Sequence, residues 1–548
     1  MKKVVIVGGV AGGASAAARL RRLDEQAEIV LFERGEYISF ANCGLPYYIG
    51  GEITDKSDLT LQTPQSFHDR FSVDVRIRSE VIAIHKEERY VTVKSHLTGE
   101  EYRESYDKLI LSPGAEPVKP LIEGAVNPRV FTLRNIPDTY RMKDYISENE
   151  PESAVVIGGG YIGIEMAENL VSAGLKVTVA EFSDHVIAPL DLDMASDVHR
   201  HLRQKGVTLI LNDGVKAIAD GENGLEISLG KETIFADMVV LSVGVRPESH
   251  LAREAGLAVN ARGAIVTDNR MLTSDLHIYA VGDAVEITDF ITGEKGYIPL
   301  AGPANKQGRI AADNIAGLGS TYEGTQGTGI LKCFDLTIAT TGINEARAKQ
   351  AGLNYEKSYT YSSSHASYYP GALPISVKIL FEKNTGRLLG AQMVGYDGVD
   401  KRMDVIATAM RLGGTVKDLT KLELSYAPPF SSAKDPVNMA GYTAENILEG
   451  RVRVFHWHDV DALPRNGSVQ LLDIRTPAEF KRGHLNGFFN IPLDDLRANL
   501  TTLDKEKPVY VTCQVGLRGY LACRILSQNG FDCANLSGGY RLYKSVMG

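Results

Sequence analysis

The sequence is short of cysteine, and it lacks long apolar runs and any excess of positive charge. No run of 18 or more apolar residues occurs, so nothing is expected to span a membrane. The net charge of −9 argues against general binding to nucleic acid or to anionic membranes. The few cysteines lie at positions 43, 333, 513, 523 and 533. Their odd number and wide spacing argue against a disulfide framework and favour reduced thiols in a cytoplasm.

The N-terminal stretch "MKKVVIVGGVAGGASAAA" imitates a signal peptide, with two lysines, an apolar stretch and small residues at its end. Four glycines between positions 8 and 13 make a poor apolar segment, which argues against export. We therefore interpret the stretch as the first strand and turn of a fold and expect a cytoplasmic protein. A chain of 548 residues, 44% of them hydrophobic and 23% charged, predicts an ordinary globular protein of three or four domains.

Two segments about 150 residues apart repeat a pattern of strand, glycine cluster, helix and strand. The second contains Gly158, Gly160 and Gly163 at the G-x-G-x-x-G spacing, which permits a tight turn and close approach of a pyrophosphate to a helix N-terminus. Glu181 ends the next strand, where it would accept bonds from an adenosine 2′-hydroxyl. No arginine follows within "FSD" to hold a 2′-phosphate, so NADH is favoured over NADPH.

The first segment departs from this spacing, because Val10 stands where the middle glycine is expected between Gly8 and Gly13. A structural turn without ligand is one interpretation. The other is a flavin site, favoured by Glu33 at the end of the next strand and by a strand-terminal Gly282-Asp283 that can bind ribityl hydroxyls. The crossover between the two nucleotide domains is predicted in "LSPGAEP", which contains Ser112 and Gly114.

This order of motifs resembles the flavoprotein disulfide reductases with two dinucleotide-binding domains. Within that superfamily, "SFANCGLPYYIGG" and "ELSYAPPFSSAKDPVNMAG" (423–441) resemble the coenzyme A disulfide reductases. The resemblance covers roughly residues 1–445. It implies FAD and NADH as cofactors, and coenzyme A as a substrate or a tightly bound group.

Cys43 lies in the first of these motifs, and no second cysteine follows within the next 280 residues. The resemblance implies that Cys43 forms a mixed disulfide with coenzyme A or carries a persulfide. A thiolate is the competent nucleophile, and a helix N-terminus beside an oxidised flavin would lower the pKa of the thiol. The alternative is a buried structural cysteine.

By resemblance, other residues would contact coenzyme A or assist its thiolate. Arg19 and Arg22 lie three apart on one helix face, which could also be a solvated surface. The coenzyme A contacts implied by the resemblance are Ser15, Arg19, Arg22, Ser39, Asn42 and Asn305, with Arg309 and Lys434 as further candidates. Tyr426 and Tyr368 would assist the leaving thiolate, with Tyr369 open in place of Tyr368 and core packing as the alternative for all three. Tyr161 would gate the nicotinamide pocket.

The C-terminal stretch "LLDIRTPAEFKRGHLNGFFNIP" (471–492) resembles the rhodanese signature. The following "VYVTCQVGLRGY" places Cys513 after a strand and before a helix, in a loop that points backbone N–H groups at the sulfur. Arg518 adds a positive charge to this anion cradle. A phosphatase-type site would use the same cradle, but the preceding signature favours sulfur. Cys523 and Cys533 fit no metal pattern and are expected to be buried; no metal site is predicted.

The predicted fold class is α/β, with two Rossmann-like dinucleotide-binding domains, an α+β dimerisation domain and a C-terminal α/β rhodanese domain. A turn at 384–386 and a helix near 398–412 are expected within the dimerisation domain. The predicted division assigns residues 1–115 and 265–322 to the FAD domain, 116–264 to the NADH domain, 323–448 to the dimerisation domain and 455–548 to the rhodanese domain.

The predicted function is NADH- and FAD-dependent reduction of coenzyme A persulfide, polysulfide or coenzyme A disulfide through Cys43, with Cys513 binding or relaying sulfane sulfur. One alternative is an NADH oxidase or peroxidase that cycles Cys43 through a sulfenic acid. Another is a redox or sulfur sensor that binds coenzyme A. Expected partners are small thiol and persulfide substrates and a second copy of the chain in a homodimer, without nucleic acid or membrane.

Overall fold

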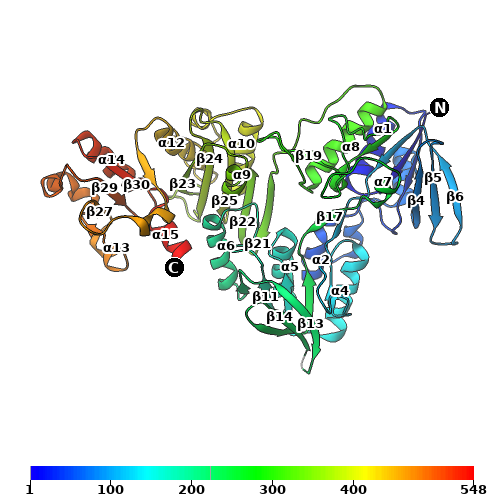
Figure 1. The fold of residues 1–548 in the computed structure, drawn as a ribbon, viewed down its shortest axis with the longest axis horizontal. Coiled ribbons are helices and arrows are strands. Elements are labelled where there is room, and N and C mark those ends of the chain that lie inside the picture. Colours follow the sequence, from blue (N-terminus) through cyan, green and yellow to red (C-terminus); the bar gives the residue numbers. More distant parts are fainter. Residues whose placement is uncertain (1, 223) are drawn as a thin grey trace. The chain divides into compact units, whose positions relative to one another are not determined.

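The computed structural model describes residues 2–222 and 224–548, and its contacts divide the chain into two compact units (Figure 1). The first unit comprises Met1–Asp184 and Gly206–Gly327, and the second comprises His185–Lys205 and Thr328–Gly548. Each unit contains two five-stranded sheets with helices packed against them. Both sheets of the first unit are parallel, and the second unit has one antiparallel and one parallel sheet. The predicted α/β fold class is confirmed.

A parallel five-stranded sheet forms the beginning of the first unit. Its order is β18 (Ile278–Ala280), β7 (Lys108–Leu111), β1 (Lys3–Val7), β2 (Glu28–Phe32) and β3 (Asp74–Arg76). The chain returns to this sheet at β18 after more than 160 residues, as expected from "IYAVGDAVE". The strand ends at Ala280, and the short turn Gly282–Ala284 follows it.

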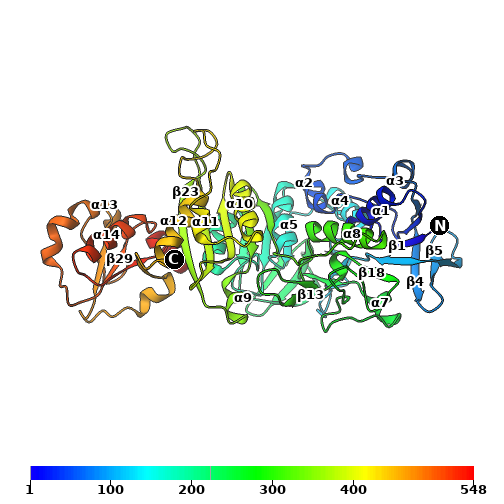
Figure 2. The same cartoon turned by 90° about the horizontal axis from the view of Figure 1, so that it is seen from above.

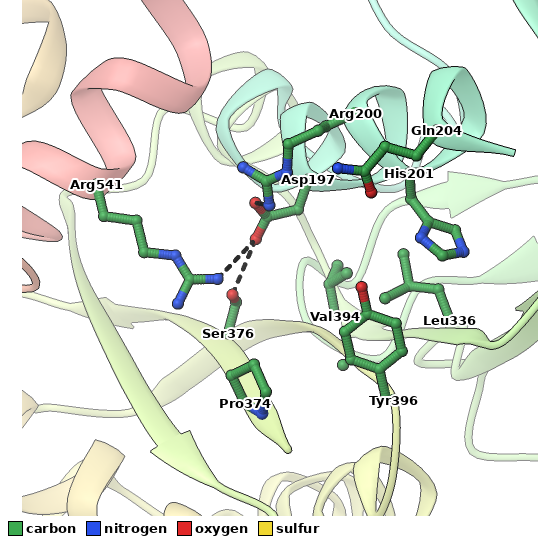
Figure 3. Close-up of a pocket in the computed structure, with 11 residues that line it drawn as sticks. Asp197, Arg200, His201, Gln204, Leu336, Pro374, Ser376, Val394, Tyr396 and Arg541 are labelled. Atoms are coloured by element: carbon green, nitrogen blue, oxygen red, sulfur yellow. Dashed lines mark hydrogen bonds and ion pairs between the residues drawn. The ribbon is translucent and has the colours of Figure 1, made fainter.

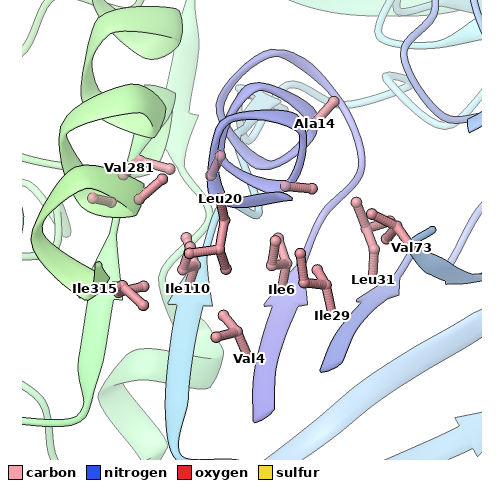
Figure 4. Packing of buried hydrophobic residues seen from close by; sticks show 14 of the residues in the cluster. Val4, Ile6, Ala14, Leu20, Ile29, Leu31, Val73, Ile110, Val281 and Ile315 are labelled. Atoms are coloured by element: carbon pink, nitrogen blue, oxygen red, sulfur yellow. The ribbon is translucent and has the colours of Figure 1, made fainter. Parts of the chain in front are cut away.

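Helix α1 (Ala11–Leu23) covers this sheet beside α8 (Ala301–Ile315) (Figure 4). Leu20 of α1 packs with Val4 and Ile6 of β1 in a fully buried cluster. The two helices approach closely because they meet at glycine: a Cβ on Gly308 would lie 2.3 Å from the carbonyl oxygen of Gly12. Helix α3 (Pro64–Phe71), which begins after a capping box at Thr63, packs against α1.

The second parallel sheet also belongs to the first unit. Its order is β12 (Thr208–Ile210), β11 (Lys176–Ala180), β10 (Ser153–Ile157), β16 (Met238–Leu241) and β9 (Val130–Phe131). Helix α5 (Tyr161–Ser172) follows β10, and α4 (Ile136–Asn149) precedes it. The short helix α2 (Leu45–Gly50) packs against α5, at a contact so close that a Cβ on Gly50 would meet the Asn169 side chain at 2.2 Å.

Smaller strands complete the first unit. Two antiparallel meanders consist of β4 (Ser79–His85), β5 (Tyr90–Ser95) and β6 (Glu101–Ser105), and of β13 (Val215–Gly221), β14 (Gly224–Leu229) and β15 (Thr233–Ala236). Strands β8 (Ala115–Pro117) and β17 (Val245–Pro247) pair with each other. Strand β8 precedes the segment that forms the second sheet, and β17 follows it. The predicted crossover "LSPGAEP" runs from the end of β7 into β8. Another pair consists of β19 (Ile287–Thr288) and β20 (Lys295–Gly296), and the remaining helix is α7 (His250–Glu254).

The first sheet of the second unit is antiparallel. Its order is β21 (Gly329–Cys333), β22 (Leu336–Gly342), β25 (Leu388–Gly395), β24 (Pro374–Glu382) and β23 (Tyr355–Ser363). The expected turn at 384–386 joins β24 to β25, and the expected helix is α10 (Val399–Arg411). Figure 2 shows α10, α11 (Val416–Leu419) and α12 (Pro436–Leu448) beside these strands, and the other helix of this region is α9 (Glu345–Gln350). Helix α6 (Leu192–Gln204), from the segment predicted for the NADH domain, packs against β25.

The other sheet of this unit is parallel. Its order is β26 (Arg453–Phe455), β30 (Cys533–Leu536), β29 (Val509–Thr512), β27 (Gln470–Asp473) and β28 (Phe489–Asn490). Its helices are η4 (Trp457–Ala462), α13 (Pro477–Lys481), η5 (Leu493–Thr502), α14 (Leu517–Gln528) and α15 (Gly539–Met547). Cys523 and Cys533 are buried in its core, as expected.

Within residues 2–222 and 224–548, no helix has the length and apolar character needed to cross a membrane. The same residues contain no group of three or more His, Cys, Asp or Glu side chains placed to hold a metal ion.

Candidate functional site

The two glycine turns of the first unit have nearly the same geometry. Gly8 and Gly158 both have positive φ, +97° and +101°, which favours glycine. A Cβ on Gly13 would lie 1.9 Å from the carbonyl oxygen of Gly8, and a Cβ on Gly163 would lie 1.9 Å from that of Gly158. The outer glycines are therefore required by the turn and by the packing of helix on strand, in both segments.

The chain itself does not require a glycine at the middle position of either turn. A Cβ on Gly160 would meet nothing within 4 Å, so this glycine leaves open space in front of the turn. Val10 occupies the equivalent position, as the residue before α1. The departure from the glycine pattern at Val10 is accommodated without a change in the turn.

The strand-terminal acids of both segments are held in the same way. The carboxylate of Glu33 accepts hydrogen bonds from the backbone N–H groups of Gly9 at 3.0 Å and Gly35 at 2.8 Å. The carboxylate of Glu181 accepts them from Gly159 at 2.6 Å and Ser183 at 2.8 Å. Each acid is thereby fixed beside its glycine turn, where a nucleotide ribose would lie.

The residues around the first turn fit a flavin dinucleotide. The Asp283 carboxylate has no hydrogen-bond or ion-pair partner in the part of the chain that the structure describes, and burial raises its pKa to about 6. Gly282 and Gly114 have positive φ, and a Cβ on Gly12 would lie 2.9 Å from the Ser112 hydroxyl. A ligand hydroxyl would satisfy the half-buried carboxylate of Asp283, for which the described residues provide no partner.

The residues around the second turn fit a second dinucleotide. The hydroxyl of Ser242, directly after β16, is buried and has no hydrogen-bond partner among the described residues. It lies at the carboxyl edge of the sheet, where the carbonyl oxygen of Ser242 approaches Gly158. Tyr161 is the first residue of α5 and is partly exposed, as a residue that gates this pocket would be.

Cys43 lies on a single 3-10 turn, Asn42–Gly44, that leads directly into α2. Both Cys43 and Asn42 are exposed, so the alternative of a buried structural cysteine is wrong. The segment is tied to the first glycine turn, because the Ser39 N–H donates to the Gly9 carbonyl oxygen at 2.8 Å. Ser39 has a φ of 44°, a strained conformation for serine.

The expected lowering of the pKa of Cys43 is not produced by the surrounding residues. Desolvation raises the pKa of the thiol, and the negative charges of Glu165 and Asp283 raise it further. Glu165, on α5, has its own pKa raised to about 7 by burial and by the neighbouring Glu168. Glu165 was not among the predicted site residues; its only signal in the sequence is its place two residues after the last glycine of the second motif.

A cleft of about 400 Å³ lies between α1, α3 and α8. Of the residues expected to contact coenzyme A, those that line it are Ser15, Arg19, Arg22, Ser39, Asn305 and Arg309. Arg70, Phe67, Phe71 and Gln62 also line it and were missed, because only the packing of α3 against α1 brings them there. Its size suits a small-molecule ligand, and its arginines suit an anionic one.

The arginines of the cleft differ in their pairing. Arg19 donates to the Asp313 carboxylate at 2.7 Å. Arg22, Arg70 and Arg309 are exposed and have no ion-pair partner among the described residues. Their charges are therefore available to phosphate groups. The Ser15 hydroxyl donates to the side-chain oxygen of Asn305, which joins α1 to α8 at the edge of the cleft.

Tyr368 and Tyr426 lie in the second unit, and their hydroxyls are 2.8 Å apart. Both are exposed, so they are not core residues. The hydrogen bond to Tyr426 raises the pKa of Tyr368. Tyr369 instead packs edge-on against His365. Lys434 is exposed in the second unit and does not line the cleft, and neither does Asn42.

Cys513 lies at the end of β29, in the loop that leads to α14. Its side chain is fully buried, and the Gly516 N–H donates to its sulfur at 3.0 Å. Gly516 has a φ of +105°, which turns this N–H toward the sulfur. One backbone donor of the predicted cradle, the Gly516 N–H, therefore lies at the Cys513 sulfur.

Arg518 forms a two-pronged ion pair with Glu479, with N–O distances of 2.8 and 2.6 Å. This pairing, chiefly through the Arg518 hydrogen bond, lowers the pKa of Glu479 to about 2. Arg475 is buried against Asp473 at 2.7 Å, and its guanidinium also donates to the Gly483 carbonyl oxygen. Asp473 and Arg475 thus hold the loop framework together and do not reach the sulfur.

Residues 2–308 match the pyridine nucleotide-disulphide oxidoreductase family. The chain belongs to this family. Residues 330–436 match the dimerisation domain of the pyridine nucleotide-disulphide oxidoreductases, and residues 456–545 match the rhodanese-like domain. The predicted resemblance to flavoprotein disulfide reductases with a rhodanese module is confirmed.

Similar proteins support the assignment to this oxidoreductase family. A coenzyme A disulfide reductase of Staphylococcus epidermidis is 37% identical over 448 residues, which are 81% of this chain and 100% of that protein. The reduced Bacillus anthracis protein designated CoADR-RHD is 52% identical, with a TM-score of 0.98 over 100% of this chain and 98% of that one. An NAD-dependent persulfide reductase from A. fulgidus is 37% identical, with a TM-score of 0.92 over 99% of this chain and 100% of that one.

Proposed function

We propose that this oxidoreductase uses NADH and a bound FAD to reduce coenzyme A persulfide, polysulfide and coenzyme A disulfide through Cys43. The observation that carries the proposal is the arginine-lined cleft. Ser39 lines this cleft, and the exposed Cys43 follows four residues later. Coenzyme A has phosphate groups at one end and a thiol at the other, so it matches a cationic cleft connected to a cysteine.

The residues that would hold the cofactors surround the two glycine turns. For FAD they are Gly8, Gly13, Glu33, Ser112, Gly114, Gly282 and Asp283. For NADH they are Gly158, Gly160, Tyr161, Gly163 and Glu181. A bound flavin would supply two-electron transfer between the nicotinamide and the Cys43 sulfur.

Cys43 performs the sulfur chemistry in this proposal. Its thiolate attacks one sulfur of coenzyme A disulfide, forms a Cys43–coenzyme A disulfide and expels one coenzyme A thiolate. Two electrons and one proton then split this bond into the Cys43 thiolate and the second coenzyme A thiol. With coenzyme A persulfide, attack at the sulfur bonded to coenzyme A forms the same mixed disulfide and expels hydrosulfide.

The second unit contributes two further groups. Tyr368 and Tyr426 would stabilise the leaving coenzyme A thiolate, since their paired hydroxyls include one free to donate. The Cys513 thiolate would attack the terminal sulfur of a polysulfide, which breaks the adjoining S–S bond, forms a Cys513 persulfide and expels the polysulfide one sulfur shorter. Backbone N–H groups such as that of Gly516, with Arg518 in the following helix, would stabilise the terminal persulfide anion.

The proposal includes the division into domains predicted from the sequence, with the FAD domain discontinuous at 1–115 and 265–322. It also places the protein in the cytoplasm as a homodimer. The exposed aromatic side chains of the second unit, Tyr368, Tyr369, Tyr426 and Phe430, support pairing through the dimerisation domain.

The first experiment is anaerobic NADH oxidation by the purified flavoprotein with coenzyme A persulfide, polysulfide or coenzyme A disulfide, with sulfide release followed in parallel. We expect a higher kcat/KM for the persulfide or polysulfide, because the chain joins the reductase to a sulfur-binding module. A preference for coenzyme A disulfide with little sulfide released would assign the enzyme to maintaining reduced coenzyme A. Hydrogen peroxide turnover would instead support an oxidase or peroxidase, and the absence of any acceptor would support a sensor.

A further inference from the structure

The first turn of α15 covers the outer side of the loop that contains Cys513. The backbone N–H of Tyr540 donates to the Cys513 carbonyl oxygen at 2.8 Å, and the N–H of Arg541 donates to the Gln514 carbonyl oxygen at 2.9 Å. The approach is very close at Gly539, where a Cβ would lie 2.6 Å from the Cys513 carbonyl oxygen. The helix thus contacts the backbone of the loop directly.

This contact fixes the direction of the loop's amide groups. In a planar trans peptide, the carbonyl of one residue and the N–H of the next point in opposite directions. Because α15 holds the carbonyl groups of Cys513 and Gln514, the N–H groups of Gln514 and Val515 point away from α15. The Gly516 N–H already donates to the Cys513 sulfur. The position of α15 therefore sets the direction of the Gln514 and Val515 N–H groups, in the loop segment between Cys513 and Gly516.

The side chains of α15 anchor it to other elements of the second unit (Figure 3). The Arg541 guanidinium lies 4.4 Å from the centre of the Tyr361 ring, on β23, and 3.8 Å from the Asp197 carboxylate, on α6. The Ser545 hydroxyl is 2.8 Å from that of Ser196. Arg541 therefore contacts the cradle loop through its backbone and two distant elements through its side chain.

The space beside this anchor is too small to be a ligand site. A cavity of about 30 Å³ lies between Arg541, Asp197 and neighbouring residues of α6, β24 and β25, which gives room for about two waters. Asp197 is already engaged by Arg200 at 2.6 Å and by Ser376 at 2.9 Å, as Figure 3 shows. These side chains therefore link α6 to α15 and to β24.

A second anchor fixes the other end of the rhodanese module. The indole N–H of Trp457 donates to the Asp193 carboxylate at 3.2 Å, and this carboxylate also accepts from Tyr359 at 2.5 Å and from the buried Lys378 at 2.9 Å. Trp457 is the one tryptophan in the chain. Its fluorescence therefore reports whether the module remains docked when the α15 anchor is changed.

We propose that Arg541 is a positioning residue for sulfur loading at Cys513, because it ties α15, and through it the cradle loop, to α6 and β23. This inference rests on the proposed function of Cys513 as an acceptor of sulfane sulfur. Arg541 does not touch the sulfur in this assignment. It acts by holding α15 against the carbonyl groups of Cys513 and Gln514, which keeps the loop between Cys513 and Gly516 in place.

The test uses the full-length holoenzyme and inorganic polysulfide, with the gain of one sulfur at Cys513 followed by peptide mass spectrometry. Arg541→Met keeps a side chain that packs on Tyr361 but removes the charge. We expect its maximal loading rate to fall about fivefold, as for the loss of one partly exposed ion pair, without a rise in the polysulfide concentration at half-saturation. Arg541→Lys should recover part of the rate. Lys544→Met, at an exposed position of the same helix, is the matched control and should load like the wild type.

Two readouts separate positioning from damage to the fold. Reduction of coenzyme A disulfide and Trp457 emission should stay as in the wild type for Arg541→Met. Equal loading rates of Arg541→Met and the wild type would overturn this inference but not the proposed function of Cys513. A lower loading rate accompanied by changed Trp457 emission, or an equally lower rate in Lys544→Met, would have the same consequence. A wild-type protein that does not load Cys513 would overturn the proposed function of the module as well.

Discussion

The two cysteines proposed to react lie in opposite surroundings. Cys43 is exposed on a short turn, and desolvation together with the nearby carboxylates raises the pKa of its thiol. Cys513 is fully buried, yet its sulfur accepts a hydrogen bond from the Gly516 N–H, and Arg518 lies in the first turn of the helix that follows, α14. The first sulfur is accessible but receives no stabilisation of its anion from these residues. The second accepts a backbone hydrogen bond but is enclosed.

This difference suggests a division of work between the sites. An exposed thiol can meet a bulky disulfide, and a bound flavin would return it to the thiolate. A buried sulfur in an amide cradle can hold a small sulfur anion but has no room for a large partner. The comparison therefore predicts that the sites differ in the size of acceptor they take and in their need for NADH.

The largest expected effect comes from removing each sulfur in turn. Cys43→Ser should reduce NADH-dependent turnover of all three acceptors by about 1000-fold or more, because the nucleophile is lost, while polysulfide still loads Cys513. Cys513→Ser should abolish that loading and leave reduction of coenzyme A disulfide within about twofold of the wild type. Steady-state NADH oxidation and peptide mass spectrometry measure the two effects. Loss of both activities in either variant would show that the sites do not work separately.

A smaller effect is expected from the positive charge at the start of α14, directly after the Cys513 loop. Arg518→Met removes the guanidinium paired with Glu479 and should slow polysulfide loading of Cys513 about tenfold, because one charge–anion interaction is lost. Turnover of coenzyme A disulfide should not change. Loading time courses at saturating polysulfide provide the measurement.

Glu479→Gln is the companion variant for Arg518. It removes the acid but keeps the arginine, so loading should not fall if the positive charge is what matters. A decrease in Glu479→Gln as large as in Arg518→Met would mean that the ion pair holds the loop in shape, and that the charge itself does not stabilise the bound sulfur.

The glycine turns could be predicted from the sequence because their requirements are local. Gly8 and Gly158 need positive φ, and Gly13 and Gly163 need the absence of a side chain against the preceding turn. Such constraints act within a few residues, so spacing alone identifies them. The cradle at Cys513 could be predicted for the same reason.

Features that depend on packing between distant segments could not be predicted. The cleft includes Arg70 and Phe71 only because α3 folds against α1. Lys378 lies on β24, which is buried on both faces, and the lysine is enclosed by carboxylates of Asp191, Asp193 and Glu345. These acids come from two other segments, so the sequence around Lys378 contains no sign of its partners.

The smallest expected effect concerns Glu165, which distinguishes the Cys43 site from the Cys513 site. Its negative charge is one cause of the raised pKa of the Cys43 thiol. Glu165→Gln should therefore lower the pKa of Cys43 and speed its alkylation at pH 8 about two- to threefold, as expected for a partly screened charge pair. Peptide-resolved alkylation rates measure the effect, and Glu88→Gln, at an exposed position of the same unit, is the control.

The pH determines whether Glu165 is charged, and therefore at which pH the wild type and Glu165→Gln should differ. Because the pKa of Glu165 is about 7, well above its ordinary value, the carboxyl is largely neutral at pH 5.5 and charged at pH 8. The two proteins should then differ above pH 7 and converge below pH 6. Ionising a carboxyl with a raised pKa also costs folding stability as pH rises from 4.5 to 7, so Glu165→Gln should raise Tm at pH 8 and leave it unchanged at pH 4.5. Equal alkylation rates at pH 8 would mean that Glu165 does not influence the thiol, and the contrast between the two sulfur sites would then rest on burial and amide donors alone.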